Sequence, residues 1–73
     1  MCGIIGINSN KPVSATIINS LKKLEYRGYD SAGIATLSNG LINEIKSEGR
    51  VDNLEKNFLV QGMKGTIGIG HVR

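Results

Sequence analysis

The sequence predicts an α+β domain whose elements follow the order β-α-β-β-α-β. Short apolar runs rich in β-branched residues lie near both ends of the chain, and apolar residues recur at helical spacing after Pro12. In the middle, an Asn-Gly pair separates two strand-like runs. The chain has 73 residues, which leaves room for one small domain.

The first strand is expected over residues 2–7, an apolar run that has the composition of a buried strand and is followed by Asn8-Ser9-Asn10. A helix is expected from about Val13 to Tyr26, with Gly28 well placed to end it. The apolar positions that predict this helix are Ile17, Ile18, Leu21 and Leu24.

Two antiparallel strands are expected over residues 31–38 and 41–46, because both residues of the Asn39-Gly40 pair tolerate positive φ. Asp52-x-x-Glu55 has the form of a capping box, in which Asp52 accepts backbone N–H bonds at the start of a helix that Gly62 ends. The last strand is expected over residues 65–72, and its glycines predict that another backbone approaches closely there.

Composition excludes several classes of function. The net charge is only +3, and two tyrosines and one phenylalanine are the only aromatic residues, so nucleic-acid binding has no support. No apolar run approaches the ~20 residues that span a bilayer, and no signal peptide is visible, so we expect a cytoplasmic protein without a membrane partner. The single Cys2 and single His71 stand far apart, and no nucleotide motif is present, so we expect neither a metal nor a cofactor.

Cys2 is the first candidate for chemistry. Removal of Met1 would leave a thiol and an α-amine on one residue, so that a nucleophile and a base are held together by covalent geometry. The alternative is a small apolar residue at the start of a core strand. The position alone leaves both interpretations open.

Further candidates lie at the ends of expected elements. Arg27 and Asp30 stand between a helix and a strand, where they form part of a site or only a local ion pair. Arg73 is able to bind a carboxylate with two parallel hydrogen bonds, although a solvated arginine is the simpler alternative. For His71 we expect a packed, hydrogen-bonded strand residue and not a base.

Three segments together resemble a known family. Residues 1–7, Met-Cys-Gly-Ile-Ile-Gly-Ile, resemble the start of the class II (N-terminal nucleophile) glutamine amidotransferases. Residues 24–33, Leu-Glu-Tyr-Arg-Gly-Tyr-Asp-Ser-Ala-Gly, resemble the more specific signature of the glucosamine-6-phosphate synthase family. Residues 68–73 resemble the next motif of that family, except that Val72 replaces a usual threonine.

The resemblance implies a site that hydrolyses glutamine. Cys2 would be the catalytic nucleophile that attacks the side-chain amide, and its α-amine would serve first as base and then as acid. Arg73 would bind the α-carboxylate of glutamine, and Arg27 and Gly28 would lie beside the nucleophile. The ammonia released would convert fructose 6-phosphate to glucosamine 6-phosphate, and the resemblance implies no cofactor.

The resemblance also implies that residues 1–73 are the N-terminal part of a larger amidotransferase domain. Its fold would be a partial αββα sandwich of the Ntn-hydrolase type, truncated and without the isomerase domains. The segments that supply the oxyanion hole and hold the substrate amine are absent, so we expect the chain alone to be inactive. Two alternatives stay open: a non-catalytic fragment or complementing subunit of a split enzyme with a separately encoded remainder, and an unrelated small α/β binding domain.

Overall fold

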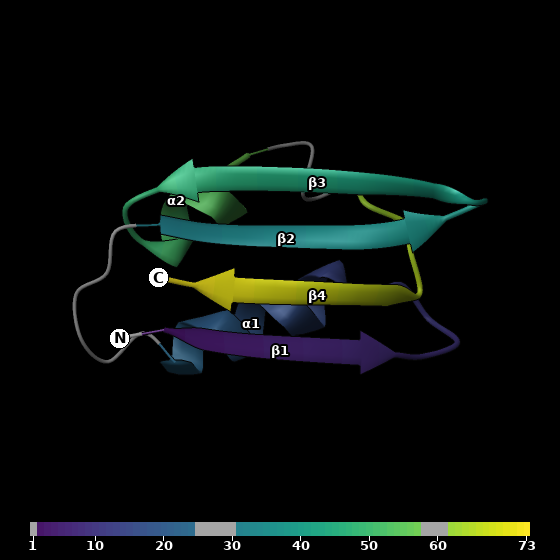
Figure 1. The fold of residues 1–73 in the computed structure, drawn as a ribbon, viewed down its shortest axis with the longest axis horizontal. Coiled ribbons are helices and arrows are strands. Elements are labelled where there is room, and N and C mark those ends of the chain that lie inside the picture. Colours follow the sequence, from purple (N-terminus) through teal and green to yellow (C-terminus); the bar gives the residue numbers. More distant parts are fainter. Residues whose placement is uncertain (1, 25–30, 58–61) are drawn as a thin grey trace.

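The computed structural model describes residues 2–24, 31–57 and 62–73. Along these residues the elements follow the order β-α-β-β-α-β, which confirms the sequence prediction (Figure 1). The elements are β1 (Gly3–Asn8), α1 (Ser14–Leu24), β2 (Ser31–Ser38), β3 (Leu41–Glu48), α2 (Val51–Glu55) and β4 (Ile67–Val72).

The four strands form one antiparallel sheet in the order β1-β4-β2-β3. The last strand therefore lies between the first and the second, and strands from opposite ends of the sequence are hydrogen-bonded neighbours (Figure 1). Val72 is paired with Gly3 on one side and with Ala32 on the other. This register brings the start of β1, the end of β4 and the start of β2 together at one end of the sheet.

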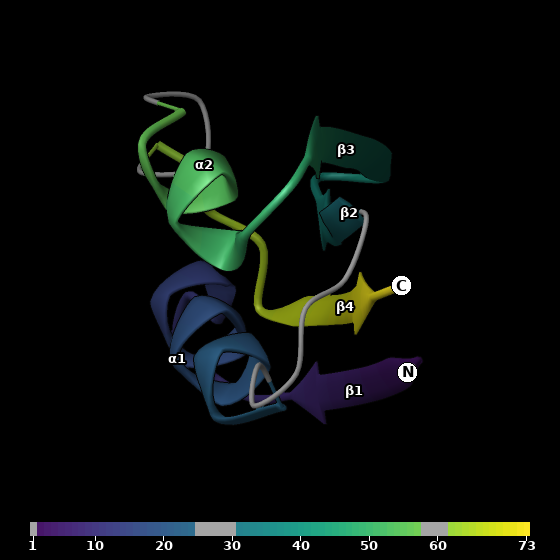
Figure 2. The same cartoon turned by 90° about the vertical axis from the view of Figure 1, so that its left-hand side faces the viewer.

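Both helices cover the same face of the sheet, which gives a two-layer structure (Figure 2). The helix α1 packs on β1 and β4, and α2 packs on β2 and β3. Burial of apolar side chains between the layers supplies most of the driving force for this arrangement. The core residues are Val13, Ile17, Ile18, Leu21, Ala32, Ile34, Val51, Leu54, Met63 and Val72.

Glycines in β4 allow α1 to lie close to the sheet. A Cβ added to Gly70 would press against Cγ2 of Ile17 and lie 3.1 Å from Cδ1 of Leu21. A Cβ added to Gly68 would lie 2.8 Å from Cδ1 of Ile17. The predicted close approach of another backbone is confirmed at Gly65, where an added Cβ would lie 2.6 Å from the carbonyl oxygen of Leu37, but not at Gly70, where side chains of α1 make it.

The hairpin between β2 and β3 is confirmed. Asn39 and Gly40 have φ values of 52° and 76°, and Ser38 is paired with Leu41 across the two-residue loop. Positive φ at both loop positions matches the right-handed twist of the flanking strands. The second strand of the hairpin continues to Glu48, two residues beyond the predicted end.

The prediction of a fully buried first strand is wrong. β1 is an edge strand that pairs only with β4, and its residues alternate between half-buried and exposed. Ile5 and Ile7 pack against the core, whereas Ile4 is 80% exposed. A continuous apolar run does not distinguish a strand buried on both faces from one whose second face is uncovered.

The first helix is confirmed over most of its predicted length. α1 begins at Ser14, one residue after the predicted start, and is described to Leu24. The predicted apolar positions Ile17, Ile18 and Leu21 are all buried. The predicted stop at Gly28 lies outside the described residues.

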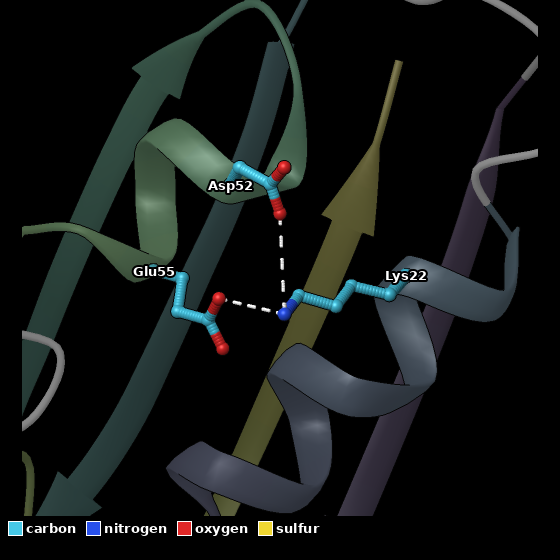
Figure 3. A network of polar contacts seen from close by, with 3 residues as sticks. All are labelled: Lys22, Asp52 and Glu55. Carbon is cyan, nitrogen blue, oxygen red and sulfur yellow. Dashed lines mark hydrogen bonds and ion pairs between the residues drawn. The ribbon is translucent and has the colours of Figure 1, made fainter.

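The capping-box prediction for the second helix is wrong. α2 is only one turn long, from Val51 to Glu55, and its N-cap residue Arg50 makes no side-chain capping hydrogen bond. The carboxylates of Asp52 and Glu55 instead lie 3.9 and 2.6 Å from Nζ of Lys22 on α1 (Figure 3). Asp52 and Glu55, which the local pattern predicts to cap the helix, therefore form ion pairs with Lys22.

The second face of the sheet carries a group of large apolar side chains, and no described element covers it (Figure 2). Alternation along the strands places five large apolar side chains on this face, all at least 40% exposed. We call it the open face, and its large apolar residues are Ile4, Leu37, Ile42, Ile67 and Ile69. Within the described residues, no helix is long and apolar enough to cross a bilayer.

Candidate active site at one end of the sheet

Two of the four predicted site residues lie together at one end of the sheet. Cys2 precedes β1 and Arg73 follows β4, one residue beyond the paired residues Gly3 and Val72. Because the strands are antiparallel, this register places Cys2 beside Arg73, and both chain ends lie at the same end of the sheet (Figure 1). Residues 71 positions apart in sequence thus become neighbours.

The face on which these residues lie follows from strand alternation. Gly3 faces α1, since a Cβ added there would lie 2.9 Å from Cδ1 of Leu24. Successive residues of a strand point to opposite faces, so Cys2 and Arg73 belong to the open face. Both residues are exposed, and the Cys2 thiol forms no disulfide.

The backbone of Arg73 is fixed by β2. Its N–H donates to the carbonyl of Ser31 at 2.9 Å, and the N–H of Ser31 donates to the carbonyl of Arg73 at 3.3 Å. These two bonds continue the β2–β4 pairing by one residue and place Ser31 on the open face beside Arg73. The exposed side chain of Arg73 therefore extends from a backbone that is hydrogen-bonded to β2.

His71 lies on the same face, two residues before Arg73. Its imidazole occupies the space where a side chain of Gly33 would stand, because a Cβ added to Gly33 would press against Nε2 and lie 3.0 Å from Cδ2. The ring is half-buried. The expected packing of His71 is confirmed, whereas its expected hydrogen bond stays a prediction, and the packing partner on β2 is Gly33.

Val72, which replaces a threonine that is usual in the family motif, lies away from this site. Val72 is only 3% exposed and belongs to the core between the sheet and α1. It stands on the opposite face from Cys2 and Arg73. The hydroxyl of a threonine at this position would therefore face the core and not the candidate site.

Arg27 and Gly28 lie outside the described residues, as does Asp30. Their predicted place beside Cys2 therefore stays a prediction. They lie within residues 25–30, which connect α1 to the start of β2, the strand whose first residue Ser31 is paired with Arg73.

The structure adds one feature that the sequence analysis missed. On the open face, one end of the sheet carries Cys2, Arg73 and Ser31, which have polar side chains. The opposite end carries the apolar residues Ile67 and Leu37. Pairing between distant segments creates this gradient, so a local pattern does not reveal it. Within the described ranges no group of three or more potential metal-ligating side chains occurs.

Known proteins were compared with the chain by sequence. No protein-family model matches it. The chain is 55% identical over 73 residues to "Glutamine–fructose-6-phosphate aminotransferase [isomerizing]" of Brucella abortus. Relatives with the same description are 52% identical in Bradyrhizobium diazoefficiens and 51% identical in Rhizobium meliloti.

Each of these matches covers 100% of the chain but only 12% of the relative. The chain thus spans about an eighth of the length of the relatives it matches. The motif-based resemblance is confirmed by this identity over the whole chain. By sequence, the whole chain matches the N-terminal region of the glutamine–fructose-6-phosphate aminotransferases [isomerizing].

Proposed function

We propose that the chain forms the nucleophile-bearing part of a glutaminase site in a class II glutamine amidotransferase domain. The observation that supports the proposal is the pairing of Gly3 with Val72, because the same register continued by one residue would bring Cys2 beside Arg73 on one face of the sheet. A thiol next to a guanidinium suits a substrate with an amide at one end and a carboxylate at the other. Glutamine has both groups.

In the proposed reaction, the Cys2 thiol gives its proton to the α-amine of the same residue and attacks the amide carbon of glutamine. The tetrahedral intermediate then collapses, and the carbon–nitrogen bond breaks as the amine returns the proton to the leaving ammonia. The thioester that remains is hydrolysed by water, which restores the thiol and releases glutamate. The mechanism requires removal of Met1, because the α-amine of Cys2 must be free.

Arg73 has a separate role in this proposal. Its guanidinium binds the α-carboxylate of glutamine and so orients the side-chain amide toward Cys2. The bonds between the Arg73 and Ser31 backbones support this role, because they fix the point from which the side chain extends. Arg27 and Gly28 are proposed, from the family resemblance, to lie beside the nucleophile.

The relatives' name describes an aminotransferase that acts on glutamine and fructose 6-phosphate and is isomerizing. We extend this description to the chain as a proposal: the ammonia it generates is passed to a fructose 6-phosphate site formed by other domains. Nothing in the proposed glutaminase chemistry requires a cofactor. The chain matches only 12% of such a relative, and we propose that the second site lies in the part that the chain does not match.

The open face supports a more specific fold proposal. A second sheet with its own helices would cover Ile4, Ile69 and their neighbours and complete an αββα sandwich of the Ntn-hydrolase type. The second sheet would also carry the donors of the oxyanion hole. On this proposal residues 1–73 are an incomplete part of the domain, and the chain alone does not hydrolyse glutamine.

A graft tests the proposed function. The 73 residues replace the matching region of the Brucella abortus relative, and glutamate release from glutamine is measured with Cys2, Cys2→Ala or Cys2→Ser. Intact mass reports whether Met1 has been removed, and isomerization of fructose 6-phosphate shows that the remainder of the protein is folded. We expect hydrolysis with Cys2 and loss of at least a thousandfold in the Cys2→Ala variant.

The alternative of a complementing subunit gives a different result. Mixing the separate chain with a relative that lacks its matching region would then restore hydrolysis without covalent linkage. If the graft hydrolyses glutamine and the mixture of separate chains does not, the result favours a single continuous domain. A graft that isomerizes fructose 6-phosphate and has lost Met1 but does not hydrolyse glutamine would contradict the proposed site.

A further inference from the structure

His71 and Gly33 form a contact on the open face that the proposed chemistry does not use. The imidazole of His71, on β4, lies over Gly33 of β2, with Nε2 and Cδ2 directed at the space where a Cβ would stand. The two residues are directly paired in the β2–β4 register. On the same face, the next pair toward the end of the sheet is Ser31 with Arg73.

We propose that His71 is a positioning residue for Arg73. Its ring, seated over Gly33, holds the last residues of β4 against β2 and so keeps the guanidinium of Arg73 directed along the open face beside Cys2. The inference rests on the proposed function, because it assigns His71 an effect on glutamine binding through Arg73.

The geometry favours this role over a direct one. The ring leans from β4 toward β2, whereas Cys2 precedes β1 on the other side of β4. His71 therefore lies on the far side of its strand from the thiol and does not suit proton transfer to it. His71 and Arg73 are two residues apart on the same face of β4, so the His71 ring is close enough to support the backbone and side chain of Arg73.

The end of β4 gains from such support because its anchor on β2 is the terminal pair of the β2–β4 ladder. Beyond Val72 the described backbone bonds of Arg73 are the two to Ser31, one of which is long at 3.3 Å. Terminal pairs of this kind open readily. A half-buried ring that bridges the preceding pair on the same face resists that opening.

The first test uses amide hydrogen exchange in the 73-residue chain. His71→Ala removes the ring, and Gly33→Ala places a methyl group where the ring lies, so both variants are expected to speed exchange of the Arg73 amide about tenfold. The amide of Leu37, near the other end of β2, serves as the reference. Equal acceleration at both amides would mean a general loss of stability and would overturn the proposal.

The second test measures hydrolysis kinetics in the graft. His71→Ala and Gly33→Ala are expected to raise the KM for glutamine roughly tenfold with little change in kcat, and His71→Phe, which keeps a ring, restores most of the affinity. A double variant with Arg73→Ala gives the decisive comparison. If His71 acts through Arg73, the double variant is no worse than Arg73→Ala alone.

The outcomes separate the two proposals. Additive effects of His71→Ala and Arg73→Ala, or an unchanged KM in His71→Ala, would overturn the positioning role and leave the proposed function intact. No effect of Arg73→Ala on KM would contradict the proposed function itself, and the role of His71 with it.

Discussion

At the scale of single residues, Thr36 is an exception within the core. It is 1% exposed, and its Oγ1 is a buried polar atom for which the described residues supply no hydrogen-bond partner. A buried hydroxyl without a partner costs about 1–3 kcal/mol of stability. The side chain lies on the helix-covered face of β2, paired with Gly68.

We therefore expect Thr36→Val to stabilise the chain by about 1 kcal/mol, because valine keeps the shape and removes the unsatisfied group. The measurement is the urea midpoint followed by circular dichroism. Thr16→Val on the exposed side of α1 is the control and is expected to change little. A clear loss of stability in Thr36→Val would show that the hydroxyl has a partner.

Gly70 is the residue at which packing leaves no room for a side chain. Gly70→Ala is expected to destabilise the chain by about 1–3 kcal/mol, because the new methyl group would meet Ile17 and Leu21 of α1. Gly6→Ala is the matched control on β1, where the nearest atom, Cγ2 of Ile69, would lie 3.8 Å away. Equal effects of the two substitutions in thermal unfolding would contradict the close packing of α1.

At the scale of elements, the sequence predicts local structure well and one-sided burial poorly. Helical spacing identifies α1, and Asn39-Gly40 identifies the hairpin, because both signals are contained in a few consecutive residues. The capping-box prediction fails because Asp52 and Glu55 pair with Lys22, which is 30 residues away from the nearer of them. No local pattern contains that partner.

In the candidate site too, the sequence predicts individual residues but not the contacts between distant ones. Motif resemblance points to Cys2 and Arg73, but only the sheet order reveals that they are neighbours. The packing of the His71 ring over Gly33 depends on the β2–β4 register, which joins residues far apart in sequence. Arg27 and Gly28 stay predictions from resemblance.

The ion pair between Lys22 of α1 and Glu55 of α2 can be tested by substitution. Lys22→Ala is expected to destabilise the chain by only about 0.5 kcal/mol, because the side chains of Lys22 and Glu55 are 36% and 45% exposed and solvent screens the pair. The effect should shrink as salt is raised. Lys23→Ala, one residue along the same helix, is the control, and an equal loss in both variants at low salt would contradict a specific ion pair.

At the scale of the whole molecule, the sheet has one face covered by helices and one uncovered face with large apolar side chains. Only the helix-covered face contributes to the core of the described residues. A small domain with an uncovered apolar sheet face has a strong tendency to associate. The proposed second sheet would bury this face and would bring the remaining catalytic groups to Cys2.

Ile69 tests whether the open face is buried in the larger protein. It is 57% exposed, so Ile69→Ser is expected to leave the stability of the separate chain nearly unchanged and to raise its solubility. In the graft the same substitution should cost about 1.5–3 kcal/mol, because a buried isoleucine is lost. Leu41→Ser, at the hairpin end, is the exposed control, and equal effects of both substitutions in the graft would contradict the sandwich.

On the function proposed here, this end of the sheet supplies the nucleophile and the carboxylate-binding residue of a glutaminase. The most direct measurement is glutamate release by the graft with and without Cys2→Ala, after intact mass has established removal of Met1. We expect the graft to hydrolyse glutamine only when Cys2 is present, and we expect no hydrolysis by the separate chain. Hydrolysis that persists in the Cys2→Ala graft, or a folded, processed graft without activity, would contradict it.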